Sequence, residues 1–426
     1  MDRQAAAKQH YDRLKKTLTD DRKVRRRTRR ARAIGLLVVG AWFIAPTYFW
    51  RIDMEEAARP EFFRRPTPHE AYLLELIDDE AGGEGLARAW ESVAYRAIDF
   101  PLSAGGAYQE VGVFSPETPQ ALGLRVHIPE GQRLRLNVEV EGGDSPRLFV
   151  DMYRAAPDTL LRPAPVRDGE LGEGRWYFDA TRTGDYVLRL QPALGGEGLY
   201  RVTFQVGAPW VFPVAGAGED DIGGVFGDSR EGGRREHHGV DIFKPRGTAV
   251  LAAADGRVTS VDTTEIGGRV VWQREADGRH SIYYAHLERP MVQSGQSLRA
   301  GDTVGLVGNT GNARTTPPHL HFGAYRRGAV DPWDLILPAP PEIPDVDVPL
   351  DALGEEGHVR ENGVRLRRSP STRGAVLTEL GNGTPLRILA GAGEWYRVAL
   401  PGGESGFVAA RLSVVATPNG TPPSNN

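Results

Sequence analysis

The sequence predicts a mainly β, multidomain protein with a single N-terminal transmembrane helix. Three observations support this prediction. Apolar and polar residues alternate between about residues 105 and 206, as they do in half-buried strands. Short β-branched runs separated by Gly, Asp and Asn occupy residues 247–311, as in antiparallel strands joined by tight turns. Residues 33–50 contain no charged side chain and are long enough to cross a bilayer.

The N-terminal segment predicts how the chain is oriented in a membrane. Residues 1–32 carry thirteen Lys or Arg and four Asp, a net charge of +9, whereas the whole chain has a net charge of −4. At about 1.5 Å per residue, a helix over residues 33–50 would span roughly 27 Å. The positive-inside rule therefore predicts a cytoplasmic N-terminus, a retained single-pass anchor and an extracytoplasmic remainder.

Two alternatives for this segment are weaker. A cleaved signal peptide would need a small-residue cleavage site, and no clear Ala-x-Ala sequence follows residues 33–50. Nucleic-acid binding by the basic run 25–30 is disfavoured because the run lies directly before an apolar span, as a topology signal does. No nucleic-acid partner is therefore expected.

Residues 51–104 are expected to form a short helical segment that acts as a spacer or a packing hairpin. Residues 68–77 and 85–94 contain good helix formers, begin with Pro or Gly and are separated by glycine. Residues 105–206 follow with alternating runs and glycine-rich turns, which predict a β-sandwich.

Two histidine clusters, residues 237–241 and 319–321, indicate a metal site. Residues two apart on a strand share a face, so His319 and His321 lie side by side and either or both could reach one ion. Imidazole and carboxylate groups are ligands that zinc accepts in catalytic sites. The clusters therefore predict a metallohydrolase. Five of the ten histidines are instead assigned to ordinary surface or core positions: His10, His69, His127, His280 and His358.

The first cluster must bend if it is to hold one ion. Strand parity joins His237 with Asp241 and turns His238 away. A straight strand would hold His237 and Asp241 roughly 13 Å apart. Gly239 lies between them and supplies the backbone freedom for a bend.

Five short motifs surround and include these clusters: His-x-Gly-x-Asp at 237–241, Gly-Thr-x-Val-x-Ala-Ala-x-Asp-Gly at 247–256, Tyr-x-His-Leu at 284–287, Gly-x-Thr-Gly at 308–311 and His-Leu-His-Phe at 319–322. In this order they resemble the lysostaphin-type (LytM) zinc endopeptidases, and the resemblance covers about residues 207–337. Two positions depart from the usual pattern. Pro318 stands where a Gly-Pro pair often precedes the last motif, and Gly323 stands where glutamate is common.

The resemblance implies an antiparallel β peptidase domain in which His237, Asp241 and His321 bind Zn²⁺. It also implies that His286 and His319 line the site without necessarily touching the metal. One of these two would take a proton from the attacking water, and the other would stabilise the oxyanion or protonate the leaving amine, with His319 favoured as the base. Competing chemistry is weaker because the chain has no cysteine nucleophile and no Walker phosphate loop.

The C-terminal part resembles a bacterial SH3-like domain, a small β-barrel. It follows a proline-rich linker that is expected to be extended and semi-rigid. Such domains often bind cell-wall peptides, so Trp395, Tyr396 and Phe407 are candidate contacts, unless these aromatic side chains fill the barrel core. The motifs that carry the resemblance are residues 364–372, 383–384, 394–398 and 406–408.

Together these patterns predict eight segments. They are a basic cytoplasmic segment (1–32), the transmembrane anchor (33–50), the helical spacer (51–104), the β-sandwich (105–206), the LytM-type peptidase domain (207–337), the linker (338–355), the SH3-like domain (356–415) and a disordered tail (416–426).

The predicted protein is a membrane-anchored zinc endopeptidase that hydrolyses peptide cross-links of bacterial peptidoglycan, with its catalytic domain in the periplasm or wall. Expected partners are peptidoglycan stem peptides, the inner membrane through one helix, and divisome or wall-synthesis proteins. The alternative is a non-catalytic LytM-type regulator that activates wall amidases or acts as an envelope scaffold. All three ligand positions and both partner histidines are present, which favours the enzyme. The bond that is cut stays open, since glycine bridges and direct D-alanine to diamino-acid cross-links are both used within the family.

Overall fold

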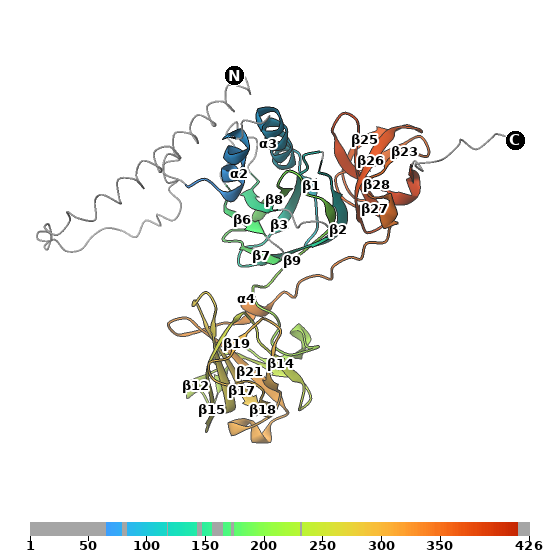
Figure 1. Cartoon of the computed structure of the whole chain (residues 1–426). Coiled ribbons are helices and arrows are strands. Elements are labelled where there is room, and N and C mark those ends of the chain that lie inside the picture. Colours follow the sequence, from blue (N-terminus) through green and yellow to red (C-terminus); the bar gives the residue numbers. More distant parts are fainter. Residues whose placement is uncertain are drawn as a thin grey trace, which may run out of the picture. The chain divides into compact units, whose positions relative to one another are not determined.

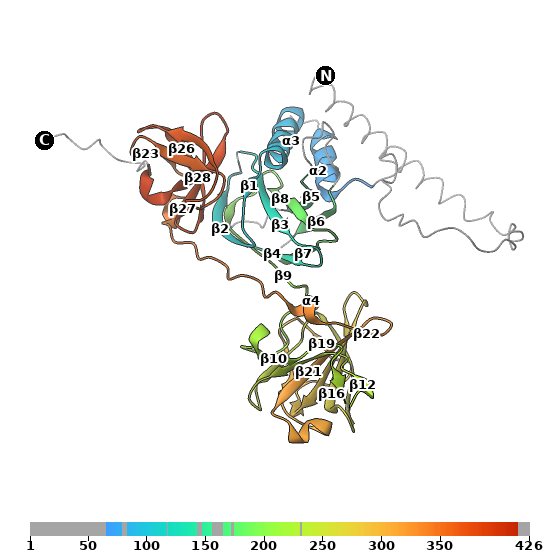
Figure 2. The ribbon, with the colours of Figure 1, turned by 180° about the vertical axis from the view of Figure 1, so that it is seen from behind.

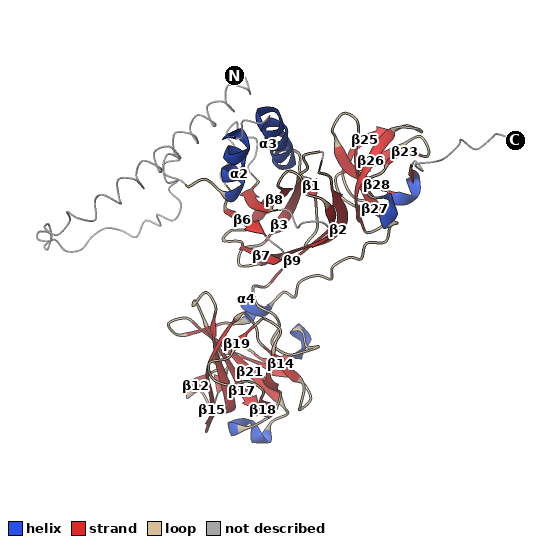
Figure 3. Cartoon of the chain, viewed as in Figure 1, coloured by secondary structure: helices blue, strands red, loops and turns tan. Residues whose placement is uncertain are grey.

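A computed structural model describes residues 65–78, 83–116, 118–142, 147–155, 165–171, 174–230 and 232–415 (Figure 1). Strands dominate these residues and helices are few, which confirms the mainly β prediction (Figure 3). The predicted transmembrane anchor and the C-terminal tail lie outside the described residues. Within the part of the chain that is described, the helices are too short or too polar to cross a bilayer.

Among the described residues, two helices precede the strands, as the sequence predicts. They are α2 (Pro68–Asp78) and α3 (Gly83–Asp99). Helix α2 begins with a reciprocal cap, because the Thr67 hydroxyl accepts the Glu70 N–H at 3.2 Å and the Glu70 carboxylate accepts the Thr67 N–H at 2.8 Å. His69 is buried and stacks on Trp90 at 4.3 Å, in keeping with its assignment as an ordinary core histidine.

In the next segment, the part that the structure describes contains nine strands, which supply the two layers of a β-sandwich. One layer contains the order β1-β3-β8-β5, and the other contains β2-β9-β4-β7. Alternation has the expected effect: on β4, Leu134, Leu136 and Val138 point into the core between polar neighbours. The strands are β1 (Leu102–Ser103), β2 (Ala107–Phe114), β3 (Leu122–Ile128), β4 (Arg133–Glu141), β5 (Leu148–Arg154), β6 (Arg167–Leu171), β7 (Gly174–Asp179), β8 (Gly184–Pro192) and β9 (Gly198–Gly207).

The SH3-like unit continues one sheet of this sandwich, which the sequence does not predict. Strand β26 pairs with β2 through Val111 opposite Gly391, so the sheet runs β25-β24-β28-β27-β26-β2-β9-β4-β7. Strands β26, β27 and β28 of this unit and β2, β9 and β7 of the sandwich are labelled in both Figure 1 and Figure 2. The strands of this unit are β23 (Glu356–Val359), β24 (Val364–Arg367), β25 (Val376–Leu380), β26 (Pro385–Ala392), β27 (Trp395–Ala399), β28 (Ser405–Ala409) and β29 (Ser413–Val415), with turns η5 (Leu350–Ala352) and η6 (Ala410–Leu412).

The aromatic side chains of this unit mostly fill cores. Phe407 is 0% exposed and belongs to the core of the sandwich, and Trp395 packs against the same core. Tyr396 is 3% exposed and donates its hydroxyl to the Pro349 carbonyl. Tyr396 and Phe407 therefore adopt the core role that the sequence left open and are not exposed to a ligand.

A buried ion pair joins β2 to the SH3-like unit. Glu110 on β2 is 0% exposed, and Arg397 on β27 donates to it from Nε at 3.1 Å and from Nη2 at 3.2 Å. The hydroxyls of Tyr108 and Tyr200 also donate to the Glu110 carboxylate, at 2.6 and 2.8 Å. Every oxygen of this carboxylate is thus hydrogen-bonded, as a buried charge requires.

The peptidase region folds around one long antiparallel sheet of order β10-β13-β21-β17-β16-β15-β19, and β14-β20-β18 form a second sheet. Its elements are η3 (Glu219–Asp221), β10 (Ile222–Gly224), β11 (Ser229–Arg230), β12 (Arg235–Glu236), β13 (Val240–Phe243), β14 (Ala249–Leu251), β15 (Gly256–Thr264), β16 (Gly268–Glu275), β17 (Ser281–Leu287), β18 (Arg289–Pro290), β19 (Ser297–Leu298), β20 (Thr303–Leu306), η4 (Gly311–Thr315), β21 (His319–Tyr325), β22 (Ala329–Val330) and α4 (Trp333–Ile336).

The chain enters and leaves the peptidase region side by side. The Ala208 N–H donates to the Pro338 carbonyl at 3.0 Å, and the Trp210 N–H donates to the Leu335 carbonyl at 2.8 Å. The proline-rich linker that follows stays in contact with its neighbours, since the Gln205 side chain donates to the Pro341 carbonyl at 2.8 Å.

Candidate metal centre

The two histidine clusters lie on neighbouring strands. Strands β13 and β21 pair with Asp241 opposite His321 and Phe243 opposite His319. Directly opposed residues of an antiparallel pair point to the same face, so Asp241, His319 and His321 share one face of the sheet. The strand parity predicted from the sequence is therefore found in the structure.

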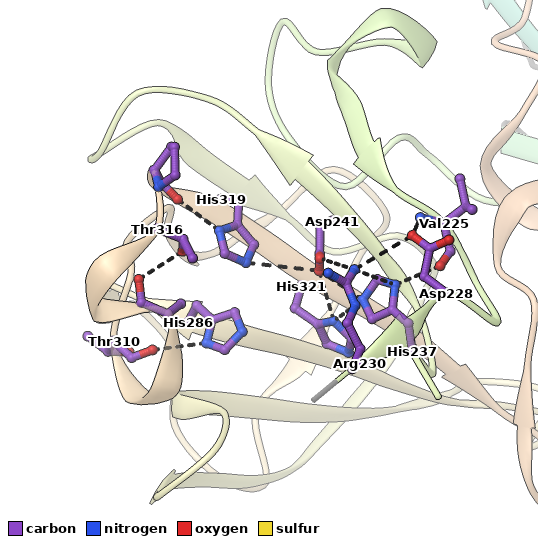
Figure 4. A network of polar contacts seen from close by, with 12 residues as sticks. Val225, Asp228, Arg230, His237, Asp241, His286, Thr310, Thr316, His319 and His321 are labelled. Atoms are coloured by element: carbon purple, nitrogen blue, oxygen red, sulfur yellow. Dashed lines mark hydrogen bonds and ion pairs between the residues drawn. The ribbon is translucent and has the colours of Figure 1, made fainter. Parts of the chain in front are cut away.

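Three donor atoms converge at this face. His237 Nε2 lies 3.0 Å from Asp241 Oδ1 and 2.9 Å from His321 Nδ1, and His321 Nδ1 lies 3.0 Å from Asp241 Oδ1 (Figure 4). These atoms all lie within 4.8 Å of one another. His237 and Asp241 are 2% and 7% exposed. Two imidazole nitrogens and one carboxylate oxygen aimed at one point fit a zinc ion with an open coordination position.

Gly239 provides the bend that brings His237 to Asp241. A Cβ atom at this position would lie 2.3 Å from the Phe322 carbonyl oxygen and 3.0 Å from His321 Cε1. The requirement is therefore close backbone approach, not an unusual backbone angle. His238 is exposed, with its ring 6.3 Å from that of Phe226, so it faces away from the cluster as expected.

Contacts behind the donor atoms hold them in place. His237 Nδ1 donates to the Val225 carbonyl at 2.7 Å, which leaves Nε2 for the cluster. Arg230 Nη2 donates to Asp241 Oδ2 at 2.8 Å, which leaves Oδ1 for the cluster. The role of Arg230 is not predictable from the sequence, because this residue is one of 52 Lys or Arg and no local pattern marks it. It reaches the site because the β11–β12 pair folds back beside β13.

His286 and His319 lie together beside this cluster (Figure 4). Their rings are 4.9 Å apart, and His319 Nε2 lies 3.9 Å from Asp241 Oδ1. His319 Nδ1 donates to the Pro317 carbonyl at 2.9 Å, and His286 Nδ1 donates to the Thr310 carbonyl at 2.9 Å. Each ring therefore keeps its Nε2 for chemistry at the site.

The backbone of His286 is strained. Its φ is 61°, a left-handed value that few residues other than glycine adopt. The His286 N–H donates to the Gly267 carbonyl at 2.7 Å, which helps to hold this conformation at the end of β17. Strain of this kind is concentrated at functional sites, where the surrounding structure holds it.

The surroundings of the site favour an ionised Asp241 and neutral His286 and His321. Burial alone would raise the pKa of Asp241, but its hydrogen bonds with His237 and His321 hold it well below the usual range of a carboxyl group. Burial lowers the pKa of His321. Burial, together with the nearby His319 and His321, lowers the pKa of His286 to about 4. Ionised carboxylate and neutral imidazole are the forms that bind a metal ion.

A buried His-Asp-His donor set flanked by two histidines is typical of a mononuclear metallohydrolase. Comparison with protein families specifies the class further. Residues 235–332 match peptidase family M23, and residues 362–413 match the bacterial SH3 domain. The chain therefore contains an M23, LytM-type peptidase domain and a bacterial SH3 domain, as its sequence motifs indicate.

Similar proteins include M23 endopeptidases. The DD-carboxypeptidase/endopeptidase Mpg of Neisseria meningitidis serogroup B is 40% identical over 107 residues, which cover 25% of this chain and 24% of that protein. The peptidoglycan DD-endopeptidase ShyC of Vibrio cholerae is 36% identical over 88 residues, covering 21% and 20%. The match thus spans about a quarter or less of these relatives. The catalytic domain of lysostaphin from Staphylococcus simulans is 30% identical, with 29% of this chain and 89% of that chain covered and a TM-score of 0.23.

Proposed function

We propose that this protein is a zinc endopeptidase that hydrolyses peptide cross-links of bacterial peptidoglycan and is anchored in the inner membrane by residues 33–50. The observation that carries the proposal is the convergence of His237 Nε2, Asp241 Oδ1 and His321 Nδ1 beside two histidines that keep Nε2 available. Relatives named for peptidoglycan and DD-endopeptidase activity support the substrate class. Residues 33–50 support the anchor through their length and lack of charge.

In this proposal His237, Asp241 and His321 hold the zinc ion, whose chemical contribution is Lewis acidity at the scissile amide. His319 acts as general base and accepts the proton of the attacking water at Nε2, since this atom is 3.9 Å from the donor set. His286 has its Nδ1 proton on the Thr310 carbonyl, so it acts as hydrogen-bond donor to the oxyanion or proton donor to the leaving amine only as the imidazolium, with a second proton on Nε2; the negative charge that develops on the substrate favours this form. The carbonyls of Pro317 and Thr310 fix both rings through Nδ1.

The test uses the full-length chain purified in detergent, with zinc content measured by elemental analysis and released peptides identified by mass spectrometry. Wild-type protein is expected to bind about one zinc ion and to release soluble peptides from isolated peptidoglycan. His321→Ala should lose both properties, whereas His319→Ala should lose hydrolysis and keep most of the metal. His238→Ala is the matched control, because the exposed His238 ring faces away from the site, and it should keep both.

The same experiment separates the enzyme from its alternative. A wild-type protein that binds zinc but leaves peptidoglycan intact would contradict the proposal. The non-catalytic regulator would then gain support if the protein increased peptidoglycan cleavage by an added wall amidase. The masses of the released peptides identify the bond that is cut.

A further inference from the structure

Three aromatic side chains form a cluster next to the metal centre, here called the aromatic platform. It consists of Trp272 on β16, Tyr283 on β17 and Tyr325 on β21. The Trp272 ring lies 4.4 Å from that of Tyr283 and 5.1 Å from that of Tyr325. The Tyr283 ring also lies 5.9 Å from the ring of His321. The platform is therefore directly adjacent to the donor set, through the contact of Tyr283 with His321.

Strand pairing places the platform on the same sheet face as the metal centre. Trp272 is opposite Tyr283, and Tyr283 is opposite Gly323, which lies two residues after His321. The residues that alternate with the platform point to the other face and are 0% exposed in the domain core: Val271, Ile282, Tyr284, Phe322 and Ala324. The three platform rings are half-buried and belong to the opposite face, so that core does not account for them.

Gly323 makes room for the platform at the position where the family commonly has glutamate. A Cβ atom at this position would lie 3.0 Å from Cε2 of Tyr325 and 3.1 Å from the His238 carbonyl oxygen. The Tyr325 ring thus lies back over Gly323. The glycine that replaces the family's common glutamate at position 323 therefore leaves the space in which the Tyr325 ring of the aromatic platform lies.

The chemistry of the platform favours a neutral ligand with a flat apolar face. The phenols of Tyr283 and Tyr325 are uncharged groups that can both donate and accept hydrogen bonds. The positive charge of Arg235 acts on Tyr325 and disfavours a second cation, such as the ammonium group of a diamino acid. In peptidoglycan, stem peptides lack aromatic rings, whereas each pyranose ring has a flat face of C–H groups and a rim of hydroxyls that suits Trp and Tyr.

We infer that the aromatic platform binds a sugar ring of the glycan strand that carries the peptide being cut. The inference rests on the proposed function and extends it, because it assigns glycan-bearing peptides as the preferred substrate. Trp272 and Tyr325 supply the stacking faces, and Tyr283 joins them to the metal centre.

The test compares two substrates of identical peptide sequence with the zinc-loaded full-length chain. One is a cross-linked tetrapeptide dimer that carries its disaccharides, and the other is the same dimer after an amidase has removed them. The wild type should show a kcat/KM about fivefold to tenfold higher for the glycan-bearing dimer. Trp272→Ala and Tyr325→Ala should bring this ratio close to one, and Tyr325→Phe, which keeps the ring, should retain it. Phe100→Ala, which removes an aromatic ring that is 67% exposed directly after the end of α3, is the control and should retain it as well.

The ratio of kcat/KM for the glycan-bearing dimer to that for the glycan-free dimer shows whether Trp272 and Tyr325 contact the ligand or only support the fold. A purely structural role would lower kcat/KM for both substrates and leave the ratio unchanged in Trp272→Ala and Tyr325→Ala, which would overturn the inference. Equal cleavage of both substrates by the wild type would also overturn it while the proposed function stands. If the wild type cleaves neither substrate, the proposed function fails and the inference fails with it.

Discussion

Replacing Arg397 by methionine should strongly destabilise the body formed by the sandwich and the SH3-like unit. The Glu110 carboxylate is 0% exposed, and Arg397 is its cationic partner through two hydrogen bonds. The hydroxyls of Tyr108 and Tyr200 would still donate to it but carry no charge. Removing one partner of a buried ion pair costs about 3–5 kcal/mol, because the other charge stays buried and uncompensated.

Urea unfolding followed by far-ultraviolet circular dichroism measures this loss. The control is Arg201→Met, because the guanidinium of Arg201 lies 4.0 Å from Glu139 with both side chains exposed, and such a pair contributes about 0–1 kcal/mol. The double variant Glu110→Gln with Arg397→Met should recover most of the lost free energy, since no charge is left buried. If Arg397→Met costs no more than Arg201→Met, the reasoning about the buried pair is refuted.

Three further predictions concern the metal centre. Arg230→Ala should weaken zinc binding by about 10–100-fold, measured in competition with a chromophoric chelator. The control Arg289→Ala, at an exposed position, should bind zinc as the wild type does. If Arg230→Ala and the wild type have equal affinities for zinc, Arg230 does not position the site. Removing zinc should lower the thermal unfolding midpoint of the wild type. The loss of stability is about 2.7 kcal/mol if the free zinc concentration had been 100-fold above Kd. The midpoint of His321→Ala should not change when zinc is removed. Gly239→Ala should destabilise the domain by roughly 1–3 kcal/mol and impair zinc binding, while Gly218→Ala, where a Cβ meets no atom within 4 Å, should be close to neutral.

Local periodicity predicted much of the fold. The alternation in β4 and the helix formers after Pro68 depend on neighbours in the sequence, and both elements form as expected. The pairing of β2 with β26 was not predictable, because it joins Val111 and Gly391 from distant segments with no complementary motif. The burial of Phe407 follows from the same contact, since it packs in a core that the SH3-like segment alone does not contain.

The candidate site was predictable where spacing along a strand decides the geometry. His319 and His321 share a face for this reason, the same parity joins His237 with Asp241, and the family motifs add His286. Arg230 could not be found in this way, since its role depends on a hairpin that folds back on Asp241. The aromatic platform depends on the order β16-β17-β21, which brings together three rings that no local pattern links.

Because the peptidase region begins and ends at adjacent points of the chain, it can be removed or replaced without disturbing the neighbouring strands. Since the backbones of Ala208 and Pro338 are hydrogen-bonded at 3.0 Å, the segment between them begins and ends at nearly one point. A domain whose two ends are adjacent can be excised and the gap closed with a short glycine-serine loop, without pulling β9 away from β2 or β2 away from β26. The sandwich and SH3-like unit then form a carrier that could accept another domain at the same point.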